Sequence, residues 1–191
     1  MYLELLGDRG LDAVLQGLDQ DLAQETLQRG CRNPKCRGVL HRARYRRKPR
    51  GIRGLKAKDC YRESFCCARK RCRSRRTPLS LRFLGPKVYL ATVVVLVSVL
   101  RCGITPMRTQ KLQQLTGASR RTVQRWRAWW LRTVPRTPWW QLRRAAFAQP
   151  ASSESDLPRS ALECFQADNA RERLILFLRF LAPLHGARLS A

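Results

Sequence analysis

Apolar residues in the first thirty positions recur at steps of three and four, and acidic residues lie on the opposite face. This period is typical of an amphipathic helix that buries one face. The apolar positions are Leu11, Val14, Leu15, Leu18 and Leu22. This pattern ends at Gly30, directly before Cys31, and glycine commonly ends a helix. The pattern therefore predicts a helix within residues 1–29.

The longest apolar run covers residues 88–100 and lies between Lys87 and Arg101. Its three consecutive valines fit a strand equally well by propensity. Its length and the glycine that follows at Gly103 favour a helix instead. The run is too short to cross a bilayer, so we expect a buried helix within a soluble, cytoplasmic protein.

The rest of the chain divides by composition. Thr137–Phe147 favours a short helix, and Asn169–Leu181 favours a longer one that Pro183 ends. Prolines, serines and aspartate between them predict a mobile linker. We expect a mainly α protein with a small β zinc ribbon, in five segments: an acidic N-terminal helix (1–30), the ribbon (31–77), a helical domain (78–148), the linker (149–160) and a C-terminal helix (161–191).

The net charge is extreme, at +26 with a pI near 11.4. Of the 39 Lys and Arg residues, 32 lie between Cys31 and Ala148, where Asp59 and Glu63 are the only acids. Charge of this density destabilises a compact fold by self-repulsion unless a polyanion compensates it. Arginine far outnumbers lysine, which favours bidentate contacts with phosphate and guanine. The central region is therefore predicted to bind nucleic acid.

Two cysteine pairs with the same four-residue spacer flank an arginine-rich stretch that has few large apolar residues. Such a segment folds readily when four thiolates bind one tetrahedral Zn²⁺. The predicted ligands of a structural zinc ion are Cys31, Cys36, Cys67 and Cys72. The stretch between the pairs is expected to form short strands with a basic loop at residues 48–51.

Other cysteines leave alternatives open. Cys66 is adjacent to Cys67 and can replace it as the third ligand, although Cys67 repeats the spacing of the first pair. His41 is a further possible ligand. Cys60, Cys102 and Cys164 are predicted to stay unligated. The acidic N-terminus does not resemble a signal peptide, so a secreted disulfide framework is not expected.

Residues 105–133 have the parts of a helix-turn-helix in order. Leu112 and Leu115 give the first helix an apolar face, and Gly117 permits a tight turn. Ser119 is placed to cap the second helix. On that helix Val123, Trp126 and Trp130 share one side, and arginines share the other. The apolar side is expected to pack and the basic side to enter a major groove.

The predicted contacts with DNA come from this second helix and from the ribbon loop. They are Arg120, Arg121, Thr122, Gln124, Arg125 and Arg132 on the helix, and Arg46, Arg47, Lys48 and Arg50 on the loop. Arginine can either read guanine or grip phosphate, and the sequence does not separate these roles. Three further tryptophans can stack bases or belong to the core: Trp129, Trp139 and Trp140.

The segment Ala118–Trp126 resembles the recognition region of transposase and resolvase-type helix-turn-helix proteins. The two cysteine pairs, with arginine-rich sequence between them, resemble the zinc ribbon that precedes such segments in bacterial insertion-element proteins. The likeness covers residues 30–135. It implies a protein that binds the ends or the promoter of a mobile element, in partnership with a transposase or another element-encoded protein and in association with the nucleoid.

Three functions follow from these features. The leading one is a non-enzymatic, zinc-stabilised, sequence-specific DNA-binding protein that acts as an accessory or regulator of a mobile element. The second is a DNA-strand-transfer enzyme or a fragment of one, which would need three carboxylates around metal ions in a region that holds only two acids. The third is an RNA-binding basic zinc ribbon.

Overall fold

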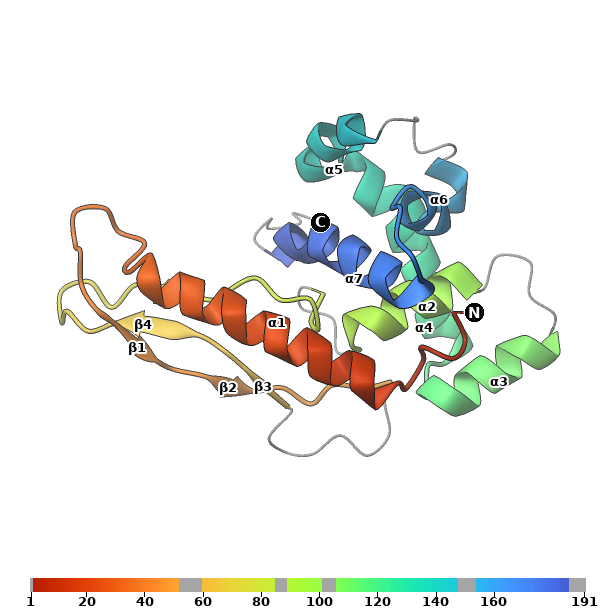
Figure 1. Cartoon of the computed structure of the whole chain (residues 1–191), viewed down its shortest axis with the longest axis horizontal. Coiled ribbons are helices and arrows are strands. Elements are labelled where there is room, and N and C mark those ends of the chain that lie inside the picture. The colour runs from red at the N-terminus through yellow and green to blue at the C-terminus, as the bar shows by residue number, and fades with distance from the viewer. Residues whose placement is uncertain (1, 52–59, 85–88, 101–105, 148–153, 186–191) are drawn as a thin grey trace.

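We describe the chain from a computed structural model that covers residues 2–51, 60–84, 89–100, 106–147 and 154–185. A long N-terminal helix runs from a helical body along a projecting β-ribbon (Figure 1). The protein is therefore mainly α with a small β part, as predicted. No helix among these residues combines the length and the apolar character needed to span a bilayer.

The N-terminal helix α1 spans Arg9–Gln28 and confirms the predicted amphipathic helix. Asp8 caps it, because its carboxylate accepts hydrogen bonds from the backbone N–H groups of Gly10 and Leu11 at 2.8 and 3.1 Å. Gly30 has a φ of +66° just past the end of the helix, a conformation that glycine adopts without strain. Leu11 and Leu15 are buried.

The β-ribbon is one continuous antiparallel hairpin. Its first strand contains β1 (Leu40–Arg42) and β2 (Tyr45–Arg46), and its second contains β3 (Tyr61–Arg62) and β4 (Phe65–Cys67). The register stays constant from Leu40 opposite Cys67 to Arg46 opposite Tyr61. A short strand β5 (Arg75–Arg76) pairs with the outer edge of β4, which gives the order β1-β4-β5.

The apolar run forms helix α2 (Ala91–Leu100), and all but its last residue are buried. This settles the choice between helix and strand in favour of the helix; Gly103 lies outside the described residues. A helix that is apolar on every face requires burial on every face. The buried hydroxyl of Ser98 donates to the Val94 carbonyl at 2.7 Å and accepts from Trp130 Nε1 at 3.2 Å.

Helices α3 (Pro106–Thr116) and α4 (Arg120–Ala128) follow one another across a short turn. Gly117 has a φ of +65°, and Ser119 caps α4 by accepting from the Thr122 N–H at 3.3 Å. Both features were predicted. Leu115 departs from the expected apolar face of α3, because 42% of it is exposed. The chain continues from α4 through a π-helical turn at Trp129–Thr133 and a 3₁₀ turn at Val134–Arg136.

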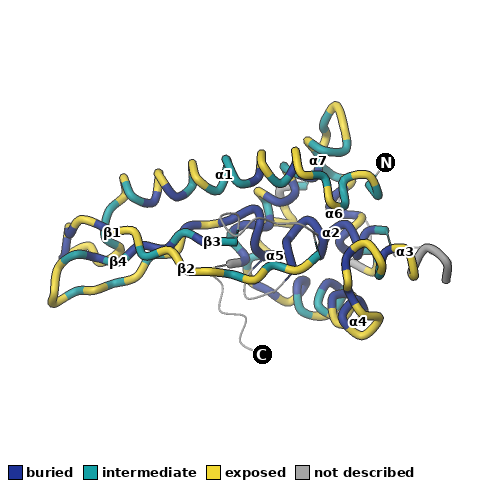
Figure 2. Tube along the Cα trace, turned by 90° about the horizontal axis from the view of Figure 1, so that it is seen from below, coloured by how far each residue is buried: buried dark blue, intermediate teal, exposed yellow. Residues whose placement is uncertain are grey.

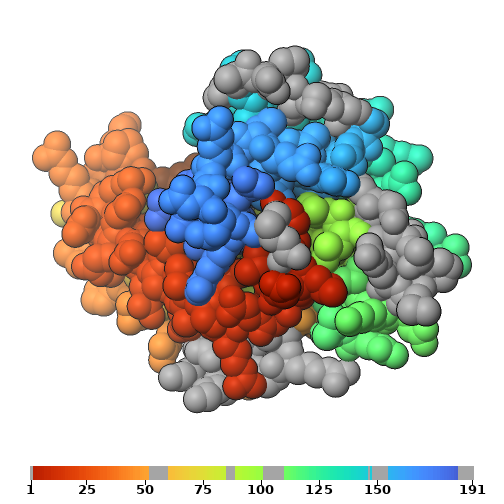
Figure 3. All heavy atoms as spheres, turned by 45° about the vertical axis from the view of Figure 1, so that its right-hand side comes forward, coloured from red at the N-terminus to blue at the C-terminus, as the bar shows by residue number. Residues whose placement is uncertain are grey.

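The C-terminal third supplies aromatic residues to the core. It comprises α5 (Pro138–Arg143), α6 (Arg159–Glu163), α7 (Ala170–Leu181) and 3₁₀ turns at Arg144–Ala146, Glu154–Asp156 and Ala182–His185. Trp140 is buried, and Trp139 contacts Phe180 with ring centroids 4.7 Å apart. Figure 3 shows the N-terminal residues and α7 side by side.

The described part of the predicted linker contains regular structure. Residues 154–160 form a 3₁₀ turn and the start of α6, and Leu157 and Ser160 are buried. Leu157 belongs to the larger apolar cluster. Residues 149–153 lie outside the described chain.

Two apolar clusters stabilise the molecule, and α1 contributes to both. The larger cluster surrounds α2 and includes Leu11 and Leu15. The smaller one lies beside the cysteines of the ribbon and includes Ala23, Leu40 and Phe65. Figure 2 shows α1 along one side of the molecule, above the strands, and α4 on the opposite side. The acidic helix therefore does not cover α4.

Candidate metal centre

Four thiols, those of Cys31, Cys36, Cys67 and Cys72, come together. The segments that carry them, between α1 and β1 and from the end of β4 onward, lie at the end of the ribbon that is distant from the helical body (Figure 1). The Sγ atoms of Cys31 and Cys72 are 3.6 Å apart, those of Cys36 and Cys67 are 3.5 Å apart, and all four lie within 4.8 Å of one another. Zn–S bonds of about 2.3 Å place tetrahedral sulfurs about 3.8 Å apart. The predicted set is therefore close enough to hold a metal ion.

The two cysteine pairs have the same local structure. In each, the backbone N–H of the second cysteine donates to the carbonyl three residues earlier: Cys36 to Asn33 at 3.0 Å, and Cys72 to Arg69 at 2.9 Å. The residue after each second cysteine is left-handed, with a φ of +46° at Arg37 and +47° at Arg73. Arginine is rare in this region of φ. The repeated turn therefore makes a four-residue spacer suitable for two facing ligand pairs.

Backbone N–H groups also point at the sulfurs. Gly38 bonds to Cys36 and Ser74 to Cys72, each from two residues further along the chain. The Ser74 N–H is the main reason that the pKa of Cys72 is lowered to about 7. Burial dominates at Cys36 and raises its pKa to about 12. A bound cation would favour the thiolate at both positions.

Gly38 is required by the packing around these sulfurs. A Cβ atom at this position would lie 2.6 Å from Cys67 Sγ and 3.2 Å from Cys36 Sγ. Ordinary contacts between heavy atoms are about 3.5–4.0 Å. Only a residue without a side chain leaves both sulfurs where they are. The sequence pattern did not identify Gly38 as part of the site.

The choice between the adjacent cysteines is settled by the alternation of β4. Cys67 is fully buried on the same face as Phe65, and Cys66 points the other way, with its Sγ 3.6 Å from the Arg73 carbonyl. Among the described residues, these four cysteines are the group of side chains close enough to bind one metal ion. His41, Cys60 and Cys164 do not belong to this group. Cys102 is not in the described chain.

The predicted DNA-contact residues on α4 fall into two groups. The exposed ones are Arg120, Arg121, Gln124, Arg125 and, just beyond α4, Arg132. Thr122 corrects the expectation, because it is buried and its hydroxyl lies 3.0 Å from that of Ser119. Val123, Trp126 and Trp130 are buried on the opposite side, as predicted. Trp129 and Trp139 are half-buried and pack on the core, together with the buried Trp140.

The residues of the ribbon loop are also divided. Arg46, Lys48 and Arg50 are exposed, whereas Arg47 is half-buried with its guanidinium 5.2 Å from the centre of the Phe83 ring. Arg47 therefore belongs to the packing between the ribbon and the helical body. The alternation of the strand explains why Arg47 differs from Arg46 and Lys48, since neighbouring side chains point to opposite faces.

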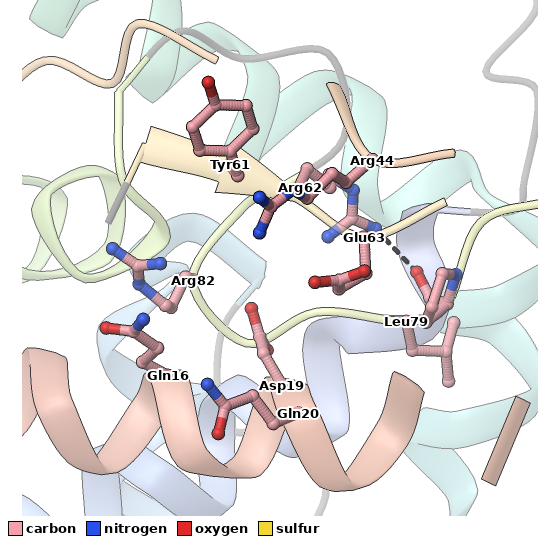
Figure 4. Close-up of a pocket in the computed structure, with 10 residues that line it drawn as sticks. Gln16, Asp19, Gln20, Arg44, Tyr61, Arg62, Glu63, Leu79 and Arg82 are labelled. Carbon is pink, nitrogen blue, oxygen red and sulfur yellow. Dashed lines mark hydrogen bonds between the residues drawn. The ribbon is translucent and has the colours of Figure 1, made fainter. Parts of the chain in front are cut away.

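A polar pocket between α1 and the ribbon holds charges that the sequence did not single out (Figure 4). Asp19 accepts hydrogen bonds from the Ser80 hydroxyl and, at 2.7 Å, from the Leu81 N–H. Arg62 donates to the Pro78 carbonyl at 2.6 Å. Burial raises the pKa of Asp19 and lowers that of Arg62. Asp19 of α1 and Arg62 of β3 thus both bond to the connector at residues 78–81, which joins α1 to the ribbon.

A second buried pair lies beside this pocket. Both nitrogens on one edge of the Arg82 guanidinium donate to the Asp12 carboxylate, at 3.1 and 3.2 Å. Only 3% of the Arg82 side chain and 12% of the Asp12 side chain are exposed. Part of the acidic charge of α1 is thus matched to arginines inside the protein.

Comparison with known proteins gives no assignment: no family model, no curated protein and no solved structure matches this chain. Its function has to be inferred from the site itself.

Proposed function

We propose that this chain is a zinc-stabilised, sequence-specific DNA-binding protein that uses α3 and α4 as a helix-turn-helix, and that it serves a mobile element as an accessory or regulatory protein. The observation that carries the proposal is the division of α4. Aromatic packing fixes one side of it, and the opposite side exposes arginines and a glutamine. A helix presented in this way matches the requirement for reading a major groove.

The cysteine centre supports the proposal as the structural element of the ribbon. Zinc is the ion expected for four thiolates at these separations, and a closed set of four protein ligands suits a structural role. The ribbon core is small, comprising Ala23, Cys36, Leu40, Phe65 and Cys67 with three partly buried neighbours. Metal binding then supplies the folding free energy that so few apolar contacts cannot.

Charge placement supports a polyanionic partner on the α4 side. Helix α1 and helix α4 lie on opposite sides of the molecule (Figure 2), and two acids of α1, Asp19 and Asp12, bond to the connector around Ser80–Arg82. They are consequently not available to neutralise Arg121 and Arg125. Phosphate contacts from such a face give binding that weakens steeply with salt.

Selection from a random duplex library with zinc-loaded protein tests the proposal. We expect enrichment of one sequence, and competition by duplex DNA that exceeds competition by single strands, duplex RNA or heparin. Arg121→Ala and Arg125→Ala should each weaken binding to the selected site by about 1–3 kcal/mol. Arg179→Ala, an exposed arginine on α7, is the matched control. Equal loss on all sequences would assign the two arginines to phosphate, and no preference for duplex DNA would refute the proposal.

A further inference from the structure

The first strand of the ribbon carries a row of positive charge with a regular period. Basic residues occupy every second position from 44 to 50, and all four are exposed: Arg44, Arg46, Lys48 and Arg50. We call this set the cationic row. Arg42 continues the pattern, but its guanidinium forms a 3.1 Å ion pair with Glu63. Alternate residues of an extended chain point to the same face.

Of the positions between these residues, 47 and 49 face the protein, whereas 41% of Tyr45 is exposed. Arg47 lies over the Phe83 ring, Pro49 is half-buried, and the Arg47 N–H donates to the Cys60 carbonyl at 2.6 Å. The backbone is therefore held in an extended form with one fixed face outward. Successive charges of the row are about 6.6 Å apart, since each strand residue advances about 3.3 Å. Every second phosphate along one strand of a duplex advances by nearly the same axial distance, about 6.8 Å.

The end of the row is attached to the turn between α3 and α4. The Arg50 carbonyl accepts from the Leu90 N–H at 3.2 Å. The neighbouring Tyr89 hydroxyl donates to the Gly117 carbonyl at 3.1 Å, and its ring meets that of Trp126 edge to face with centroids 5.0 Å apart. Tyr89 thus contacts both the turn and α4.

A glycine lets the row approach this closely. Gly51 has a φ of +104°, and a Cβ atom there would lie 2.6 Å from Val93 Cγ2. The chain next to Arg50 therefore rests directly on α2, the most buried helix. The end of the cationic row at Arg50 is consequently connected to α4 through α2 and Tyr89.

We infer that the cationic row follows the phosphate backbone of the same DNA duplex whose groove receives α4, and that Tyr89 is the positioning residue that sets the distance between them. This inference rests on the proposed function and adds a second contact to it. The row supplies affinity without base specificity, because phosphate contacts fix register and carry no sequence information. The exposed face of α4 supplies the specificity.

Single alanine substitutions along the row test the inference, because outward-facing and inward-facing positions should give different results. For the selected duplex, each of Arg46→Ala, Lys48→Ala and Arg50→Ala should reduce the slope of log affinity against log salt by about 0.9, the value of one phosphate contact. Discrimination between sequences should not change. Arg47→Ala is the adjacent control, and it should leave the slope unchanged because its side chain faces Phe83.

The tyrosine is tested separately. Tyr89→Phe keeps the ring against Trp126 and removes the hydrogen bond to Gly117, so we expect about fivefold weaker binding to the selected duplex. Tyr2→Phe removes a buried hydroxyl that has no hydrogen-bond partner among the described residues, and it should not weaken binding. Thermal melting of every variant checks that the fold is retained.

The outcomes separate the two proposals. If row variants leave the slope unchanged while Arg121→Ala and Arg125→Ala still weaken binding, the row is not on the DNA and the role of α4 stands. An equal effect of Arg47→Ala and Lys48→Ala on the salt slope would also overturn the inference, since it would not then matter whether a side chain faces outward or inward. If neither set of variants changes binding, both proposals fail.

Discussion

Replacement of Gly38 by alanine is the most direct test of the cysteine centre. The added Cβ atom would lie 2.6 Å from Cys67 Sγ, about 1 Å inside an ordinary contact. Cys67 is fully buried, and its N–H donates to the Ser74 carbonyl at 2.9 Å. The sulfur can therefore yield only by leaving its place opposite Cys36.

Overpacking of this kind costs about 1–3 kcal/mol. If the whole cost falls on the metal-bound state, the affinity for Zn²⁺ decreases by about 5- to 150-fold, since 1.4 kcal/mol corresponds to a factor of ten. Competition with a chromophoric chelator measures this affinity, and Cys31→Ser sets the scale for a site that has lost a ligand. We expect Gly38→Ala to lie between wild type and that variant.

Gly17→Ala is the matched control for the same chemical change. A Cβ atom at Gly17 meets nothing within 4 Å, and the residue lies inside α1. Alanine there should stabilise the protein by about 0.5–1 kcal/mol and leave Zn²⁺ affinity unchanged. If Gly38→Ala instead has the Zn²⁺ affinity and the melting temperature of the wild type, the packing described around the sulfurs is refuted.

Two further predictions concern protons and buried charge. Because burial raises the pKa of Cys36 to about 12, metal binding at neutral pH must displace its proton; Zn²⁺ affinity should rise about tenfold per pH unit for each proton released. The dependence of Zn²⁺ affinity on pH should steepen below pH 7, where Cys72, with a pKa of about 7, is also protonated. Chelator competition across this pH range measures it, and a constant affinity would contradict the prediction. Asp12→Ala removes the carboxylate that accepts two hydrogen bonds from the buried Arg82 and should lower the free energy of unfolding by about 3–5 kcal/mol. Arg29→Ala, in an exposed pair, should cost less than about 1 kcal/mol, and similar urea midpoints for the two variants would refute the distinction.

Local patterns predicted much of this fold because their causes are local. The cap at Ser119, the turn at Gly117 and the helix in the apolar run each depend on residues within a few positions. The choice of Cys67 over Cys66 was also within reach, since Phe65 and Cys67 share a strand face that excludes the residue between them.

Features that join distant segments were not visible in the sequence. Asp12 and Arg82 are 70 positions apart, and nothing near either residue marks it as a partner in a chain with 39 basic residues. The inward direction of Arg47 depends on where Phe83 packs. The same holds for Tyr89, whose hydroxyl bonds to a turn 28 positions away.

The position of α1 has a consequence for the metal-free protein. Its first half is held by the packing of Leu11 and Leu15 and by the ion pair of Asp12. Ala23 and Leu27 in its second half instead pack in the smaller cluster, to which the cysteines contribute. Withdrawal of the ion should therefore loosen the helix from its far end and spare its beginning. Fraying should stop before Asp19, which bonds to Ser80 and Leu81, since Leu22 and Leu18 also pack on the larger cluster.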